Sequence, residues 1–452
     1  MAPKRSLSSD SLESGGSPSL AAVAKDWPAS SAALQSARSF LRECALKSSC
    51  TLLVPDKDAD GLTGTLIIYR TLVALGHPEH ALKLHFINKG SNPHENSERQ
   101  KLAAHRAEYA IVVDQGSRSG PALVLGAKTL LVDHHLSDDF PADTLVLSAC
   151  KHEPVATSAT LAYVLCRPLH SSIVTSCDYL CAMGTLGDLG TSFQFAPPFP
   201  QDDMNACFKK YTKKAVTDAV SLVNAPRRTA TYDVESAWKA LHASSGPSDI
   251  VNPPRTSPAL LANTTRLREA RAEVNAEVER CTHTPPAFSG DGKVALLRIA
   301  SEAQVHPVSS CSKPTQQEAD SAQVIATRWA GHLRSARLQV VMVANTGYTP
   351  GRTHFSCRVA RTARAPSAVD IIALLKDYAA RVPGLADEMG DDFARGHRQA
   401  SGGIVATAQF ERLWEAMVVS VPDDGQGAES PRKKRKTEEV QKNTLEGWVK
   451  RS

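Results

Sequence analysis

The sequence lacks any apolar run near the ~18 residues that a membrane span requires, and residues 1–20 lack the apolar core of a signal peptide. We therefore expect no membrane partner. A strong charge bias is also missing, because 52 Lys and Arg against 47 Asp and Glu leave a net charge of +5 over 452 residues. This balance excludes a protein that is basic over its whole surface, so any surface that binds nucleic acid must be local.

Cysteine pairs with the spacing of a metal site are absent as well. The ten cysteines are scattered, and the nearest to a motif is Cys177 with Cys181, one helical turn apart. That spacing is more typical of core packing than of a ligand pair. Without a secretion signal, we expect reduced thiols and an intracellular protein.

The chain is longer than one ordinary hydrophobic core accommodates, so two domains with tails are expected. Both ends are polar, and residues 1–20 are rich in Ser, Gly and Pro, which is typical of disorder. We predict a disordered tail over residues 1–24, a first domain over 25–262, a connecting helix over 263–282, a smaller domain over 283–420 and a disordered tail over 421–452.

Between the tails, short β-branched apolar runs alternate with helical segments. Strands are expected over 49–54, 110–114 and 129–133, and helices over 64–75 and 158–169. This alternation predicts an α/β protein with a parallel sheet and helices on both faces. A second alternating stretch, with strands near 337–345 and 353–360, predicts a smaller α/β domain.

Three acids, Asp56, Asp58 and Asp60, stand two residues apart directly after the first strand. The order Asp-x-Asp-x-Asp-Gly is that of an EF-hand calcium loop, but such a loop needs an acid at its twelfth position, where this sequence has Ile67. A strand also precedes the acids in place of a helix, which excludes the EF-hand. A solvated acidic turn or another cation site remains.

The order of strand and acid recurs along the chain. Asp114 follows the second strand, Asp133 with His134 and His135 ends the third, and Asp188 stands in what we expect to be a glycine-containing turn. Each Asp alone is typical of a helix N-cap. Because the carboxyl ends of parallel strands meet at one edge of a sheet, the acids together predict a site for two divalent cations, which would turn repulsion into coordination.

The segments 56–61, 112–116, 132–135 and 184–188 resemble, in order, the four motifs of the DHH phosphoesterase superfamily. Residues 391–405 resemble the signature of the DHH-associated C-terminal domain, and residues 222–241 resemble a segment of the RecJ branch. The resemblance covers roughly residues 51–419. It implies a catalytic DHH domain over 25–262 and a substrate-binding domain over 283–420.

Members of this family hold two divalent ions, usually manganese, and hydrolyse phosphoric esters. The resemblance therefore implies metal ligands at Asp58, Asp60, Asp114, His134 and Asp188, and we choose Asp114 as the carboxylate that bridges the ions. Oxygen ligands with one or two imidazoles favour Mn²⁺, with Mg²⁺ as the alternative.

Three neighbours of these ligands have other implied roles. Asp56 is either a further metal ligand or holds one in place. His135 is a catalytic candidate that contacts the scissile phosphate or serves as a ligand, and Asp133 is the catalytic candidate that orients the histidines.

The resemblance also implies substrate-binding residues in the second domain. We expect a glycine-rich loop from Gly396 to Gly403 to bind phosphate through backbone N–H groups, and the alternative is an ordinary β-turn. Arg358 suits bidentate phosphate contact, unless it is only a surface arginine of a strand. The predicted set is Arg358, Gly396, His397, Arg398, Ser401 and Gly402. Asn224 and Arg227 are weaker candidates, because Asn-Ala-Pro alone is a turn.

The C-terminal tail carries two possible partner motifs. Lys433, Lys434, Arg435 and Lys436 follow a proline and match a nuclear import signal read by an import receptor; the alternative is a solvated charge run. Leu445 and Trp448 resemble the anchors of a degenerate sliding-clamp-binding motif. We therefore expect a nuclear protein.

These features predict a manganese-dependent, RecJ-like exonuclease that acts on single-stranded DNA or RNA. One alternative is a hydrolase of small nucleotides, very short oligonucleotides or polyphosphate. It is favoured because too few residues follow Val419 to form the oligonucleotide-binding barrel that RecJ-type exonucleases often carry. The other alternative is a non-catalytic replication or repair scaffold, which the full set of acids argues against.

Overall fold

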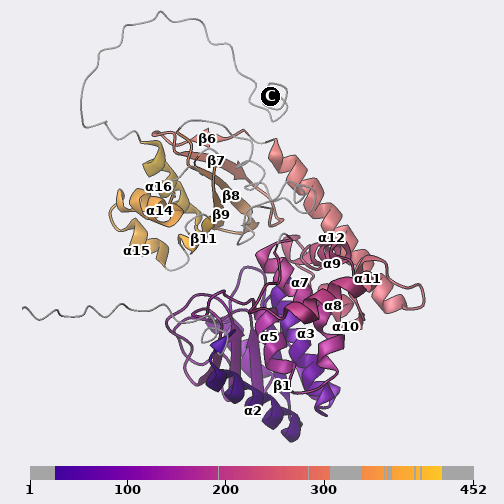
Figure 1. Ribbon diagram of the computed structural model, residues 1–452. Coiled ribbons are helices and arrows are strands. Elements are labelled where there is room, and N and C mark those ends of the chain that lie inside the picture. The colour runs from indigo at the N-terminus through magenta and orange to yellow at the C-terminus, as the bar shows by residue number, and fades with distance from the viewer. Residues whose placement is uncertain are drawn as a thin grey trace, which may run out of the picture.

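The computed structural model describes residues 26–305, apart from 192 and 284, and residues 337–419, apart from 361–362, 364–368, 391–392 and 398–399. Two sheets organise these residues, and each has its own hydrophobic core (Figure 1). Within the described part, no helix combines the length and apolar character that a membrane span needs.

The first sheet has five parallel strands in the order β2-β1-β3-β4-β5. The strands are β1 (Thr51–Pro55), β2 (Leu82–Leu84), β3 (Tyr109–Val113), β4 (Lys128–Asp133) and β5 (Thr144–Ser148). Every residue of β1 and β3 is buried. Helices and connections cover both faces of this sheet, which explains why its central strands are continuous apolar runs without polar alternation.

Helices surround this sheet unevenly. One face packs against α2 (Ser31–Lys47), α3 (Ala59–Ala74) and α5 (Ser158–Cys166), and the other receives α4 (Asn96–Ala104) through Leu102. The remaining elements of this domain are η2 (Glu79–Ala81), α6 (Ile173–Ser176), α7 (Asp178–Leu189), α8 (Gln201–Lys210), α9 (Lys213–Val223), η3 (Pro226–Arg228), α10 (Val234–Ala243) and α11 (Pro247–Val251).

A single long helix, α12 (Pro258–Thr282), joins the two domains (Figure 1). It begins earlier than the predicted connecting helix of residues 263–282, because Pro258 is well suited to the first turn of a helix. Leu267 packs into the core of the first domain, whereas Val274 and Val278 pack into a core of the second. The apolar stripe of one helix therefore stabilises both domains.

The second sheet is mixed and has the order β10-β11-β9-β8-β7-β6. Its strands are β6 (Ala287–Phe288), β7 (Val294–Ile299), β8 (Val340–Thr349), β9 (Arg352–Val359), β10 (Arg395–His397) and β11 (Ala400–Ala406). Helices α14 (Ile371–Ala380), α15 (Leu385–Met389) and α16 (Thr407–Val418) pack on it. The predicted fold class, a parallel α/β domain followed by a smaller α/β domain, is confirmed.

Contacts around η3 hold the two domains together. The Lys89 ammonium lies 4.2 Å from the ring centroid of Tyr348 and donates to the carbonyl of Glu302 (3.1 Å). The Tyr348 hydroxyl donates to the carbonyl of Arg227 (3.3 Å), and the Gln304 N–H donates to the carbonyl of Arg228. The backbone of η3 is thus fixed from the side of the second domain.

Candidate metal centre

The acids of the first domain converge at the carboxyl edge of its sheet. Asp56 follows β1, Asp114 follows β3, and Asp133 is the last residue of β4. Asp58 caps α3 by accepting from the N–H groups of Asp60 and Gly61. Adjacent parallel strands end together, so residues separated by tens of positions in sequence become neighbours, as predicted.

Asp188 reaches the site by a different route from the predicted one. It lies in the last turn of helix α7, not in a turn that follows a strand. The glycine at position 184 serves close packing inside this helix, because a Cβ there would lie 2.3 Å from Ala159 Cβ and 2.8 Å from Asp60 Oδ1. The prediction of a glycine-containing turn is therefore wrong, although Asp188 does join the cluster.

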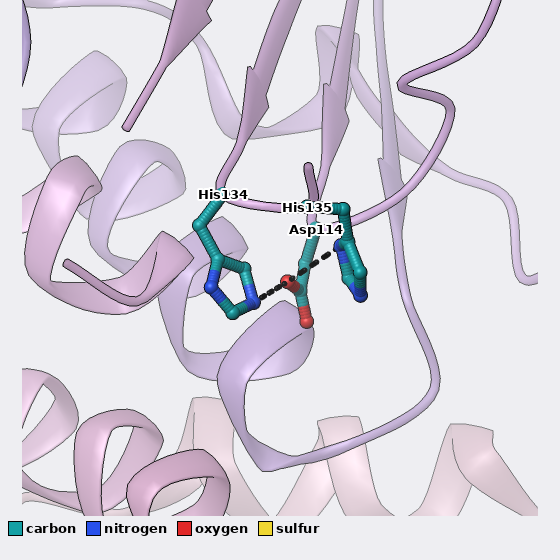
Figure 2. Close-up of side chains that lie close together, drawn as sticks. All are labelled: Asp114, His134 and His135. Atoms are coloured by element: carbon teal, nitrogen blue, oxygen red, sulfur yellow. Dashed lines mark ion pairs between the residues drawn. The ribbon is translucent and has the colours of Figure 1, made fainter. Parts of the chain in front are cut away.

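Two overlapping groups of ligand atoms share Asp114. Asp114, His134 and His135 form one group and Asp56, Asp58 and Asp114 the other, with the atoms of each group within 4.8 Å of one another. The two histidines lie on either side of the Asp114 carboxylate (Figure 2), with His134 Nε2 at 3.3 Å and His135 Nδ1 at 3.9 Å from its Oδ1 atom.

His134 also connects this carboxylate to the remaining acids. Its Nε2 atom lies 3.8 Å from Asp188 Oδ2 and 3.9 Å from Asp60 Oδ2. A single imidazole nitrogen therefore faces three carboxylates, and a divalent ion bound among them could take this nitrogen and the carboxylates as its ligands.

Hydrogen bonds from outside the cluster hold the carboxylates in place. Asp60 accepts from the N–H groups of Ser158 (2.8 Å) and Ala159 (2.9 Å) at the N-terminus of α5, where the helix dipole favours a negative charge. The Ser158 hydroxyl donates to Asp114 Oδ1 (2.8 Å). Asp133 Oδ1 accepts from the backbone N–H groups of His134 and His135 and lies 2.8 Å from His135 Nδ1.

The electrostatics separate these acids into two kinds. Burial, followed by the charges of Asp188 and Asp58, raises the pKa of Asp60 to about 6, although His134 opposes the shift. Burial, Asp60 and Asp58 raise the pKa of Asp114 well above its usual range. Two buried carboxylates therefore hold their charge against a penalty, which is the condition that a bound cation relieves.

Asp133 and His135 form an ion pair with the opposite behaviour. Burial works against the charge on both groups, but their attraction and hydrogen bond outweigh it. The pKa of Asp133 falls to about 2 and that of His135 rises to about 9. Asp133 is thus an orienting group, as its geometry also indicates, and His135 is an imidazolium at neutral pH.

The residues present fit divalent metal ions. The donor set is carboxylate oxygens with imidazole nitrogen, which suits Mn²⁺, and Asp114 is shared by both groups of ligand atoms. Its backbone has φ 65°, in the left-handed region. A strained backbone of this kind is frequent at ligand clamps and is consistent with a functional constraint on the central carboxylate.

Sequence reasoning missed Ser158 and undervalued the segment after α9. Ser158 follows the N-cap Thr157, and this capping pattern was the signal that could have placed an anion acceptor there. The Asn224 side chain accepts from the Ala59 N–H (2.9 Å), and Arg227 Nη2 lies 3.8 Å from Asp58 Oδ2. The Asn-Ala-Pro-Arg segment therefore reaches the start of α3 directly.

The predicted substrate residues of the second domain that the structure describes lie in its sheet. Arg358 on β9 pairs in register with Ala400 on β11, and Gly402 pairs with Ser356 on one side and with Arg395 on the other. The predicted glycine-rich loop is therefore wrong, because Gly396, Ser401 and Gly402 lie in paired strands. A Cβ at Gly402 would lie 2.4 Å from the Phe355 carbonyl oxygen, which explains the glycine by close strand packing.

Several predicted residues lie outside what the structure describes. They are Arg398, the side chain of His397, the proposed import residues Lys433, Lys434, Arg435 and Lys436, and the proposed anchors Leu445 and Trp448. Nine cysteines are described, and all are free thiols in the structure.

A parallel α/β domain with clustered aspartates and an Asp-His-His sequence at its strand edge defines a class of phosphoesterases, and comparison with known proteins agrees. Residues 51–185 match the DHH family, N-terminal domain. The predicted resemblance to the DHH phosphoesterase superfamily is therefore confirmed over this domain.

Among individual proteins, the chain is similar to the single-stranded-DNA-specific exonuclease RecJ of Thermus thermophilus. The two are 29% identical over 169 residues, which cover 34% of this chain and 25% of that protein. The chain thus spans only a quarter of the curated relative.

Solved structures show the same fold. RecJ of Thermus thermophilus in complex with Mn²⁺ has a TM-score of 0.53 and 18% identity, over 85% of this chain and 54% of that one. The DHH domain of a member of a family of ribosomal proteins has a TM-score of 0.56 and 15% identity, over 85% of this chain and 89% of that one.

Proposed function

We propose that this protein is a manganese-dependent phosphodiesterase that uses two ions to remove nucleotides from an end of single-stranded nucleic acid. The observation that carries the proposal is the cluster of carboxylates and the His134 imidazole around Asp114. Similarity to a single-stranded-DNA-specific exonuclease, whose solved structure contains Mn²⁺, supports the choice of substrate and metal.

Most residues of the site would hold the metal ions. Asp56, Asp58, Asp60, Asp114, His134 and Asp188 would hold the ions, which supply Lewis-acid activation of water and neutralise phosphate charge. The carboxylates of Asp60 and Asp114 are already positioned by the N-terminus of α5 and by Ser158. The rigid placement of these ligands limits reorganisation during the reaction.

His135 is the group that would contact the phosphate. Asp133 engages its Nδ1 atom, and the side chain is 60% exposed, so the Nε2–H bond is presented to the solvent side of the site. Because the pKa of His135 is raised to about 9, this N–H remains available at neutral pH. It can donate a charge-assisted hydrogen bond to a phosphoryl oxygen as negative charge develops there.

The cellular part of the proposal rests on the tail. Lys433, Lys434, Arg435 and Lys436 would bind an import receptor and place the enzyme in the nucleus, and Leu445 with Trp448 would anchor it to a sliding clamp. Support comes from the sequence pattern, and both partners would bind independently of the catalytic domain.

The test uses purified full-length protein with Mn²⁺, offered end-labelled single-stranded DNA and RNA, dinucleotides and polyphosphate in parallel. We expect a ladder of shortened strands that grows from one end and disappears with EDTA. His135→Ala should lower the rate, whereas Asp143→Asn, on an exposed turn, is the matched control. Cleavage confined to dinucleotides or polyphosphate would replace the proposed substrate, and the absence of any hydrolysis would favour a scaffold.

A further inference from the structure

A loop of the first domain lies against the backbone that carries Asp114. This loop, residues 88–95, runs from the segment after β2 to the start of α4, and we call it the 88–95 loop. Asp114 itself begins the loop after β3, residues 114–119, which we call the Asp114 loop. The two loops meet through His94 and Asn92, neither of which is among the candidate metal ligands.

The conformation of the Asp114 loop needs support from its surroundings. Asp114 has φ 65° and Gly116 has φ 99°, so two residues of this short segment lie in the left-handed region. Aspartate tolerates this region better than most residues, yet at a steric cost that surrounding contacts must offset. The contacts that hold this loop therefore also determine where the Asp114 carboxylate points.

The first half of the Asp114 loop is held by the sheet and the second half by His94. The Asp114 N–H donates to the carbonyl of Val132 on the neighbouring strand (2.9 Å). Further along, the Gly116 carbonyl accepts from the Arg118 N–H (2.8 Å), which is a bond within the loop, and from His94 Nε2 (3.0 Å). His94 thus ties the second half of the loop to a different segment of the chain.

The imidazole of His94 is well defined in its protonation and its packing. A carbonyl can only accept, so the Nε2 atom carries the hydrogen of this bond. Burial lowers the pKa of His94, the bond to Gly116 opposes the shift, and the charges of Arg118 and Arg99 add to it, so the ring is neutral at neutral pH. The Nδ1 atom faces Gly120, where a Cβ would lie only 3.1 Å away.

The 88–95 loop is itself anchored on two sides. The Asn92 Oδ1 atom accepts from the His94 N–H (3.0 Å) and from Arg118 Nη2 (3.3 Å), which joins the two loops a second time. The Lys89 ammonium lies 4.2 Å from the ring centroid of Tyr348 in the second domain. His94 therefore projects from a fixed segment and can transmit that rigidity to the Asp114 loop.

We propose that His94 is a positioning residue for the metal centre, which holds the Asp114 carboxylate in its metal-binding orientation through the hydrogen bond to Gly116. The inference rests on the proposed function and deepens it, because it adds a residue that lies outside the ligand set. Asp114 is shared by two groups of ligand atoms, so a change in its backbone would disturb both at once. Residues that orient metal ligands typically change metal affinity by tenfold or more.

The experiment measures Mn²⁺ affinity of the full-length protein by titration, with the electron paramagnetic resonance signal of free Mn²⁺ as the readout. His94→Ala should weaken binding by about tenfold. His94→Gln should restore most of the affinity, because its amide N–H reaches the position of Nε2, whereas the shorter His94→Asn should not. His80→Ala, at an exposed histidine of η2, is the matched control and should leave the affinity unchanged.

Two further measurements separate positioning from a merely structural role. A structural role would lower Tm equally in EDTA and in Mn²⁺. Positioning predicts that the rise in Tm produced by Mn²⁺ is smaller in His94→Ala than in the wild type and is restored in His94→Gln. In activity assays, the Mn²⁺ concentration for half-maximal rate should increase about tenfold, while kcat at saturating Mn²⁺ changes less.

Hydrogen exchange reports on the Asp114 loop without any metal. In EDTA, the backbone amides of residues 114–118 should exchange faster in His94→Ala than in the wild type, because the loop has lost one of the bonds that hold it. His94→Gln should return the exchange rate towards that of the wild type.

The outcomes separate this inference from the proposed function. Unchanged Mn²⁺ affinity in His94→Ala, or equal losses in His94→Gln and His94→Asn, would overturn the positioning role and leave the proposed function intact. If His94→Ala does not fold, the Gln and Asn variants decide, since only Asn should lose affinity. If the wild type binds no Mn²⁺, the proposed function fails, and equal exchange over residues 114–118 in wild type and variants would overturn the role of His94 as well.

Discussion

Replacing Asp114 by asparagine tests the metal centre through stability as well as activity. The substitution keeps the shape and the acceptor for the Ser158 hydroxyl, which donates to Asp114 Oδ1 at 2.8 Å. It also suits the backbone, because Asn is among the residues that best tolerate the left-handed region that φ 65° occupies. Only the negative charge is lost.

The size of the effect follows from the crowding of the carboxylates. At an effective dielectric constant of ~20, two unit charges repel by about 3 kcal/mol at 4.8 Å, the limit within which the ligand atoms of Asp56, Asp58 and Asp114 lie. The imidazole of His134, 3.3 Å away, offsets part of this. We expect metal-free Asp114→Asn to be more stable by ~1–3 kcal/mol at pH 8, a rise in Tm of roughly 2–10 °C.

Mn²⁺ should reverse this order. At a hundredfold excess over Kd, an ion that binds only the folded state adds about 3 kcal/mol to the wild type, and Asp114→Asn should lose most of this gain together with hydrolysis. Thermal scans with EDTA and with Mn²⁺ measure both effects. Asp143→Asn is the matched control, since Asp143 also has a positive φ (54°) but is exposed.

Two results would refute the reasoning. If Asp114→Asn is less stable than the wild type in EDTA, carboxylate repulsion does not govern this site. If the variant gains as much stability from Mn²⁺ as the wild type and keeps full activity, Asp114 does not share the ions.

Four further predictions concern other parts of the molecule. Asp133→Asn should return the pKa of His135 from about 9 towards the ordinary 6.5, which an NMR titration of the metal-free protein would show, and an unchanged pKa would contradict the ion pair. Because the folded pKa of Asp60 is raised to about 6, its contribution to stability is fully present below pH ~4 and lost as the pH rises to about 6. The free energy of unfolding, measured with urea in EDTA, should fall by about 3 kcal/mol as the pH rises through that window. Asp60→Asn should remove most of this pH dependence. Gly184→Ala should destabilise the protein by ~1–3 kcal/mol, as overpacking does, because the added Cβ would lie 2.3 Å from the Cβ of Ala159. An unchanged Tm would show that α7 can move away from α5 without cost. Removing all residues after Val421 should abolish nuclear accumulation and clamp pull-down while kcat/KM stays constant, and a truncated protein that remains nuclear would reduce the basic run to a solvated tail.

Much of the second domain was less accessible to sequence reasoning than the first. The glycines near Gly402 have the composition of a phosphate-binding loop, yet they form strands, because β11 must approach the β9 backbone closely enough that a Cβ would meet the Phe355 carbonyl. Glycine marks close backbone approach in both situations. Only the register of the partner strand distinguishes them.

Local patterns were enough to predict the parallel sheet and the convergence of Asp58, Asp114 and Asp133. Buried parallel strands have continuous apolar sequences, and the residues that follow each strand lie at the carboxyl edge that the strands share. The groups that complete the site were visible only once the chain was folded. Asp60 accepts from Ser158, 98 positions away, and Ala59 donates to Asn224, 165 positions away. The electrostatics of the centre depend on such packing of distant segments, which no local pattern records.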